Sequence, residues 1–122
     1  MAIESGRITH IREAVLPVRL AENLTVDCIV DTGFSGALML PRDIVSGLSI
    51  PLLGRETFEL VSGQFFTANL ALAQIDWLGQ KRPLRIVISE GSDALIGTEM
   101  LDGNRLVIDY INNRVTLTND LT

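Results

Sequence analysis

The sequence holds one cysteine and one histidine, and this shortage excludes several kinds of chemistry. One cysteine cannot form an internal disulfide, and one cysteine with one histidine makes no metal-ligand cluster, so we expect no metal and no other cofactor. Cys28 lies in an apolar run without a basic neighbour, which favours a buried structural thiol over a nucleophile.

Long apolar runs and positive charge are scarce as well. The longest apolar runs have the length of a β-strand, so the sequence predicts no membrane span and no membrane partner. The 10 basic residues are scattered and 15 acidic residues outnumber them, so the net charge of −5 argues against nucleic acid as a partner. The N-terminal segment MAIESGRITHIRE lacks the apolar core of a secretory signal, from which we expect a cytoplasmic protein.

The composition itself is that of a globular protein. Hydrophobic residues make up 47% of the 122 positions and charged residues 20%. A chain of this length builds one modest core, so we expect a single domain over residues 1–122. Short runs rich in Val, Ile, Leu, Thr and Phe, separated by Gly, Asn and Pro, predict an all-β fold.

The expected elements follow from these runs. Strands are predicted over residues 14–20, 24–30, 37–40, 83–89 and 94–97. A long hairpin is predicted over residues 56–78, with its tip at 61–64, and a second turn over 79–82. Short helices are predicted over 41–48 and 98–102, the second capped by Thr98 and ended by Gly103. The last hairpin, over 105–118, should turn at Asn112 and Asn113, since Asn tolerates the positive φ angle that such turns need.

One acidic residue stands out in the stretch CIVDTGFSGALMLP, residues 28–41. Asp31 lies in the middle of an apolar run, where a carboxylate is costly unless it is hydrogen-bonded or its proton affinity is shifted. Taken alone, Asp31-Thr32-Gly33 also fits an ordinary turn in which the Asp side chain bonds its own backbone. The apolar residues before Asp31, and ALIG some sixty residues downstream, point to a more specific role.

The ordered set of motifs resembles the retropepsin-like aspartic proteases. The set comprises IVDTGFSG, a long hairpin in the position of the flap, ALIG followed by TEML, and a closing pair of strands, over residues 14–117. The resemblance implies an all-β, closed acid-protease-like β-barrel: a half-pepsin (retropepsin) domain with one or two short helices. It also implies an aspartic endopeptidase that acts on peptide or unfolded protein substrates.

The chain carries one Asp-Thr-Gly, whereas a pepsin-like chain carries two, so the resemblance implies a homodimer with one Asp31 from each copy. Two carboxylates held close together cannot both ionise, and the pair shares a proton. The ionised carboxylate would take a proton from the attacking water, and the protonated one would donate to the peptide carbonyl oxygen.

The same resemblance implies roles for the neighbours of Asp31. Thr32 would brace the loop of the opposite copy, and the Gly33 N–H would help to hold the carboxylate. Residues 95–97 would pack beneath the Asp31 loop. The residues expected to contact substrate are Phe34, Ser35, Val61, Ser62, Gly63, Gln64, Ile96 and Gly97.

Less specific interpretations stay open beside these roles. Gly97 can be a glycine that simply ends a strand, and the flap an ordinary hairpin. For the whole chain, one alternative is a catalytically silent dimerisation or peptide-binding module of the same fold. Another is a different all-β domain in which Asp-Thr-Gly is a turn.

Phe34 departs from the pepsin-like pattern, which often has Ser or Thr after Asp-Thr-Gly. Losing a hydroxyl donor and gaining an apolar ring should both disfavour the ionised pair. We therefore expect a pH optimum nearer neutral than that of a gastric-type enzyme. A pH–rate profile of peptide cleavage measures this, and a maximum below about pH 3 would contradict it.

Overall fold

The computed structural model of the chain describes residues 1–119, so the last three residues of the domain expected over 1–122 lie outside the described part. Ten strands and two short helices are present in residues 1–119. In chain order they are β1 (Ile3–Ile8), β2 (Ala14–Ala21), β3 (Leu24–Val30), β4 (Leu38–Pro41), α1 (Arg42–Leu48), β5 (Leu52–Glu59), β6 (Phe65–Trp77), β7 (Gln80–Ser89), β8 (Leu95–Ile96), α2 (Thr98–Leu101), β9 (Arg105–Asp109) and β10 (Arg114–Thr118).

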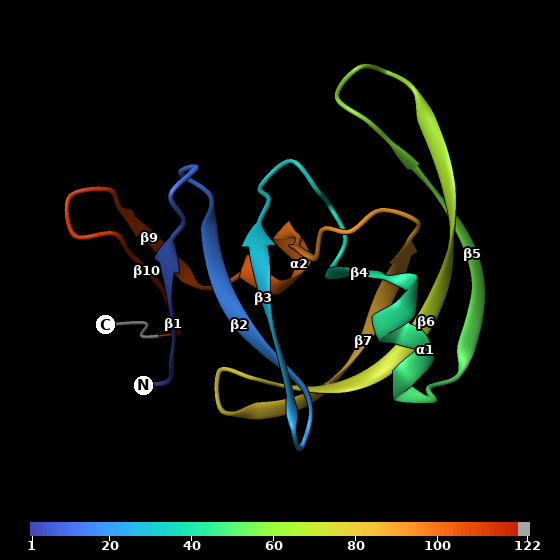
Figure 1. Cartoon of the computed structure of the whole chain (residues 1–122), viewed down its shortest axis with the longest axis horizontal. Coiled ribbons are helices and arrows are strands. Elements are labelled where there is room, and N and C mark those ends of the chain that lie inside the picture. Colours follow the sequence, from blue (N-terminus) through green and yellow to red (C-terminus); the bar gives the residue numbers. More distant parts are fainter. Residues whose placement is uncertain (120–122) are drawn as a thin grey trace.

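Six of the strands close into a barrel (Figure 1). Around the ring the order is β2, β3, β8, β4, β7 and β6, and β6 returns to β2 through the pair Arg19 and Asp76. The expected all-β fold with a closed barrel and short helices is therefore confirmed. Strand β3 has the predicted bounds.

The barrel closes around an apolar core. Over residues 18–21 of β2 and 84–86 of β7, buried and exposed side chains alternate, because successive side chains of a strand point to opposite faces. Trp77, 1% exposed, lies at the end of β6 and donates a hydrogen bond from Nε1 to the carbonyl oxygen of Met100, at 3.2 Å. This bond ties α2 to the barrel wall.

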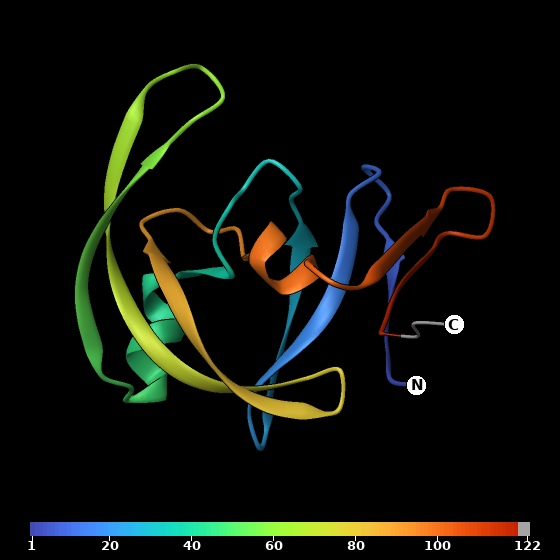
Figure 2. The ribbon, with the colours of Figure 1, turned by 180° about the vertical axis from the view of Figure 1, so that it is seen from behind.

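Strand β6 has two parts with different partners. Its C-terminal part lies in the barrel beside β7, whereas its N-terminal part pairs with β5 alone and rises above the barrel as a hairpin (Figures 1 and 2). The hairpin tip is confirmed at residues 61–64, where the Leu60 amide donates to the Gln64 carbonyl at 2.7 Å. The first arm begins at Leu52, earlier than the predicted residue 56, with a register shift before Gly54.

Three local predictions are wrong or incomplete. Thr98 does not cap α2, because Gly97 occupies the N-cap position and no side chain bonds there. The turn expected over 79–82 is tighter: Leu78 and Gly79 have φ angles of 52° and 78°, and β7 begins at Gln80. In the last hairpin only Asn113 has the expected positive φ angle, 54°.

The N-terminal strand is internal to the sheet. Strand β1 lies between β2 and β10, with Ile3 opposite Thr118. The sheet order begins with β5 and ends with β9, so these two strands are its edges in the described part of the chain. No helix within residues 1–119 is long and apolar enough to cross a membrane.

Cys28 is fully buried, with 0% of its surface exposed, as expected of a structural thiol. Burial, reinforced by the negative charge of Asp27, raises the pKa of this thiol to about 12.

We therefore expect a thiol reagent at pH 8 to label the Cys28 thiol of the native chain at least about 100-fold more slowly than that of the chain unfolded in guanidinium. The absorbance of the thiolate that the reagent releases gives the labelling rates of the native and the unfolded chain. Equal rates would contradict the burial of Cys28.

Candidate active site around Asp31

Asp31 follows directly on the end of β3. Strand β3 pairs in parallel with β8, Val30 lying opposite Ile96, and the Asp31 amide continues the ladder with a bond of 2.9 Å to the Ile96 carbonyl. The end of β3 thus places the carboxylate at the mouth of the barrel.

The loop after β3 holds the carboxylate by its own backbone. Oδ1 of Asp31 accepts a hydrogen bond of 2.9 Å from the Gly33 amide, and the Phe34 amide donates to the Asp31 carbonyl at 3.1 Å. Asp31 is half-buried, while Thr32 and Gly33 are exposed. This geometry is that of an Asx turn, and it leaves the second carboxylate oxygen without a hydrogen bond from residues 1–119.

The segment after β8 braces this loop from below. Consecutive backbone amides of the segment donate to carbonyls of the loop. The pairs are Gly97 to Ala37 at 2.8 Å, Thr98 to Phe34 at 2.8 Å and Glu99 to Gly36 at 3.2 Å. The loop therefore owes its shape to a segment some sixty residues further along the chain.

Gly97 is required by the closeness of this contact. A Cβ atom added at Gly97 would lie 2.0 Å from the Gly36 carbonyl oxygen and 2.7 Å from the Phe34 ring. No side chain fits between two backbones at that separation. Gly97 thus does more than end a strand.

Phe34 is buried beneath the flap hairpin. Its side chain is 8% exposed and belongs to a small cluster with Leu70 and Val87. The ring centroids of Phe34 and Phe58 lie 5.9 Å apart, and those of Phe58 and Phe66 lie 5.3 Å apart. This aromatic row connects the Asp31 loop to both strands of the hairpin.

A largely apolar cavity of about 200 Å³ separates Asp31 from the hairpin tip. It is lined by Asp31, Gly33, Phe34, Ser35, Met39, Phe58, Glu59, Leu60, Val61, Phe66 and Leu95. The carboxylate therefore faces a space that the arching hairpin covers, as Figure 1 shows for the two backbones.

The structure brings most of the expected site residues together, with exceptions. Asp31, Gly33, Phe34, Ser35 and Val61 line one cavity, and Thr32 lies exposed in the same loop. The flap-tip residues Ser62, Gly63 and Gln64 are exposed and do not line it.

The substrate contact expected of Ile96 needs a correction. Ile96 is 0% exposed and belongs to the main core, because β8 turns alternate side chains to opposite faces, so that Leu95 lines the cavity instead. Gly97 likewise lies beneath the loop rather than in the cavity.

The sequence interpretation missed Met39 and Phe58 as cavity residues. Met39 stands in β4, whose alternation of buried and half-buried residues places it on the face opposite the main core. Phe58 stands in β5, whose residues are nearly all exposed, so no alternation marked it. The pattern could not show that the two faces meet over Asp31. Within residues 1–119, no group of three His, Cys, Asp or Glu side chains is placed to hold a metal ion, and the expected absence of a metal stays a prediction.

Comparison with known proteins gives matches both in sequence and in structure. No family model matches the chain. An uncharacterized protein of Archaeoglobus fulgidus is 30% identical over 104 residues, and the match covers 79% of this chain and 79% of that protein.

The structural matches cover nearly the whole chain. A retropepsin-like aspartic protease from Rickettsia conorii matches with a TM-score of 0.63 and 15% identity, over 96% of this chain and 94% of its own. The retroviral protease-like domain of Ddi1 from Leishmania major matches with a TM-score of 0.55 and 15% identity, over 88% and 90%. At 15% identity, these two matches show a similarity of fold alone.

The contact at Gly97 predicts a selective loss of stability. Gly97→Ala should lower the free energy of unfolding by roughly 1–3 kcal/mol, because the added methyl overpacks two backbones. Gly47→Ala in α1 is the matched control: its Cβ meets nothing within 4 Å, so it should be neutral or stabilising by up to about 1 kcal/mol. Urea unfolding followed by Trp77 fluorescence compares the two, and equal stabilities would contradict the close contact.

Proposed function

Since this chain has the retropepsin-like fold and belongs to one protein family with the uncharacterized Archaeoglobus fulgidus protein, we propose that it is an aspartic endopeptidase that acts as a homodimer. The observation that carries the proposal is the position of Asp31. Its carboxylate lies in a loop at the end of β3 and faces an apolar cavity beneath a hairpin tip.

A second copy of the chain is needed because peptide hydrolysis requires an acid and a base at once. In the proposed dimer two Asp31 carboxylates meet across a two-fold axis and share one proton, so their titration belongs to the pair. The ionised carboxylate activates a water molecule, and the protonated one donates to the carbonyl oxygen of the peptide bond.

The surroundings of Asp31 support this arrangement. Thr32 is exposed and its side chain makes no hydrogen bond within residues 1–119, so its hydroxyl is available to the partner's loop. Val61 at the hairpin tip is 97% exposed. An apolar residue so exposed fits a flap that closes over an extended peptide and excludes water.

The alternative is a catalytically silent dimerisation or peptide-binding module. It is favoured by the hydrogen bond from the Gly33 amide to Oδ1 of Asp31, which an ordinary Asx turn also makes. The two proposals differ in whether Asp31 is needed for turnover.

Replacement of Asp31 distinguishes them. Asp31→Asn should reduce cleavage of an unfolded protein by at least about 100-fold, because the amide can act neither as base nor as shared acid. Asp76→Asn is the control, since Asp76 is an exposed carboxylate at the opposite end of β6 from the flap and does not line the cavity at Asp31. Gel-based cleavage assays give the rates, and sedimentation velocity shows whether dimers persist.

Cleavage retained by Asp31→Asn would refute the assignment.

The dimer is tested by the same assay over a range of chain concentrations. Activity should rise faster than linearly at low concentration, where mass action dissociates the dimer. A monomer by sedimentation with undiminished specific activity would refute the shared pair.

A further inference from the structure

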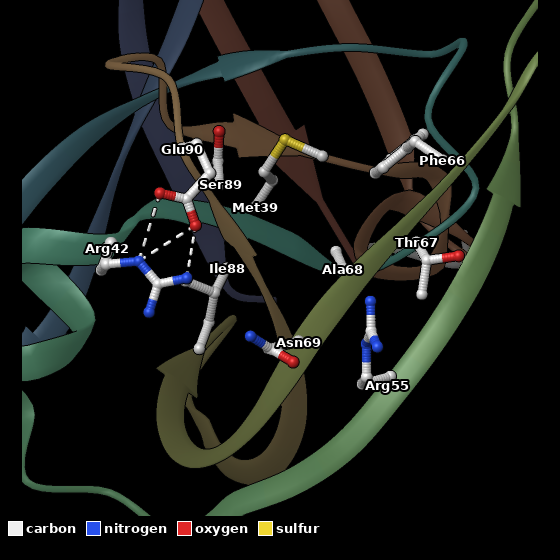
Figure 3. A pocket seen from close by; sticks show the side chains of 10 residues that line it. All are labelled: Met39, Arg42, Arg55, Phe66, Thr67, Ala68, Asn69, Ile88, Ser89 and Glu90. Carbon is white, nitrogen blue, oxygen red and sulfur yellow. Dashed lines mark hydrogen bonds and ion pairs between the residues drawn. The ribbon is translucent and has the colours of Figure 1, made fainter.

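A second cavity, of about 400 Å³, lies where the flap hairpin leaves the barrel (Figure 3). The ladder between β6 and β7 ends at the pair Leu70 and Val87. Beyond it, residues 65–69 of β6 pair with β5 on one side and have no ladder partner among residues 1–119 on the other. The cavity is therefore bordered by a free strand edge, to which an extended peptide can add.

This cavity adjoins the cavity that Asp31 faces. Met39 and Phe66 line both of them, and together they separate the two spaces. A peptide whose scissile bond lies over Asp31 and whose chain follows β6 away from the flap tip would thus reach the second cavity. A volume of about 400 Å³ is within the range that encloses ligands in proteins.

The cavity has an apolar floor and a charged rim. The floor is formed by Met39, Phe66, Ala68 and Ile88, and the rim by Arg42, Arg55, Thr67, Asn69, Ser89 and Glu90 (Figure 3). Arg42 and Glu90 form an ion pair, with Nε of Arg42 donating to the two carboxylate oxygens at 3.0 and 3.2 Å. Arg42 lowers the pKa of the Glu90 carboxyl by this hydrogen bonding, and the two charges of the pair compensate each other.

Arg55 is the remaining charge on the rim. It takes part in no ion pair within residues 1–119, and its cross-strand neighbour is the uncharged Asn69. Glu56, next to Arg55 in β5, lines a different cavity because adjacent side chains of a strand point to opposite faces. The second cavity thus offers one uncompensated guanidinium and one amide donor.

We propose that the second cavity is a distal part of the substrate cleft that takes an Asp or Glu side chain of the peptide, with Arg55 and Asn69 binding its carboxylate. This inference rests on the proposed peptidase function and adds a substrate preference to it. A guanidinium and a carboxylate bind through charge-assisted hydrogen bonds, and the apolar floor strengthens them by excluding water. The acidic chain repels acidic peptides overall, so the preference is local to one substrate position.

The preference is tested by letting the enzyme cleave a library of proteome-derived peptides and recording which sites it cuts. Sites cut by the wild-type dimer, identified by mass spectrometry, should be enriched in Asp and Glu at one fixed position away from the scissile bond. Arg55→Gln should lower kcat/KM for such a peptide about 10-fold, while leaving its Gln-containing twin unchanged. Arg55→Glu should shift the enrichment to Lys and Arg at the same position, and Arg55→Lys should keep it for acidic residues.

Arg19→Gln is the matched control, because Arg19 is also an exposed strand arginine but lies where β2 meets the far end of β6. It should leave the profile unchanged. A wild-type profile without acidic enrichment, or the wild-type profile unchanged in Arg55→Gln and Arg55→Glu, would overturn the inference.

A binding measurement separates this inference from the proposed function. The ligands are fluorescently labelled heptapeptides of otherwise uncharged residues, made in pairs that carry either Glu or Gln at each position in turn. Their binding to the Asp31→Asn chain is measured by fluorescence anisotropy. Tighter binding of one Glu peptide than of its Gln twin, lost with Arg55→Gln and kept with Arg19→Gln, supports the site even if the wild type cleaves nothing. Equal binding of all twins refutes the site even if the wild type is an active peptidase.

Discussion

The segment that follows β8 presses against the loop that follows β3, and the position of the Asp31 carboxylate depends on this contact. Gly97 has no Cβ to hold the two backbones apart, and the amides of residues 97–99 satisfy the carbonyls of the loop. Buried carbonyls need such partners, and each one left without a hydrogen bond is costly. The loop is thus held from below, while its upper side, with Thr32 exposed, stays uncovered.

Strand β6 connects the barrel to the space above the carboxylate. At one end it closes the ring by meeting β2, and at the other it leaves β7 and forms the flap hairpin with β5. Both cavities arise from this departure, because a strand that leaves its neighbour opens a gap between two faces. The aromatic row from Phe34 through Phe58 to Phe66 fills part of the gap and fixes how far the hairpin stands from the Asp31 loop.

Much of the fold could be predicted from the sequence, because strands and turns leave local signals. The bounds of β3 and the hairpin tip at residues 61–64 follow from alternation and from turn residues. The start of β5 could not be predicted, since its side chains are nearly all exposed and show no buried face. The prediction that Thr98 caps α2 was wrong, because a residue type that often caps helices gives no information about backbone contacts. Here such contacts hold Gly97 in the N-cap position.

The sequence by itself determined the kind of fold, the loop that carries Asp31 and the glycine beneath it. These are encoded in short patterns, each of which reflects the conformational preferences of neighbouring residues. The tertiary structure alone decided that Leu95 rather than Ile96 faces the cavity, and that Met39 and Phe66 lie between two cavities. It also left Arg55 on the rim without an ion-pair partner from the described part of the chain. Such facts depend on which faces of distant strands meet, and a one-dimensional pattern carries no information about that meeting.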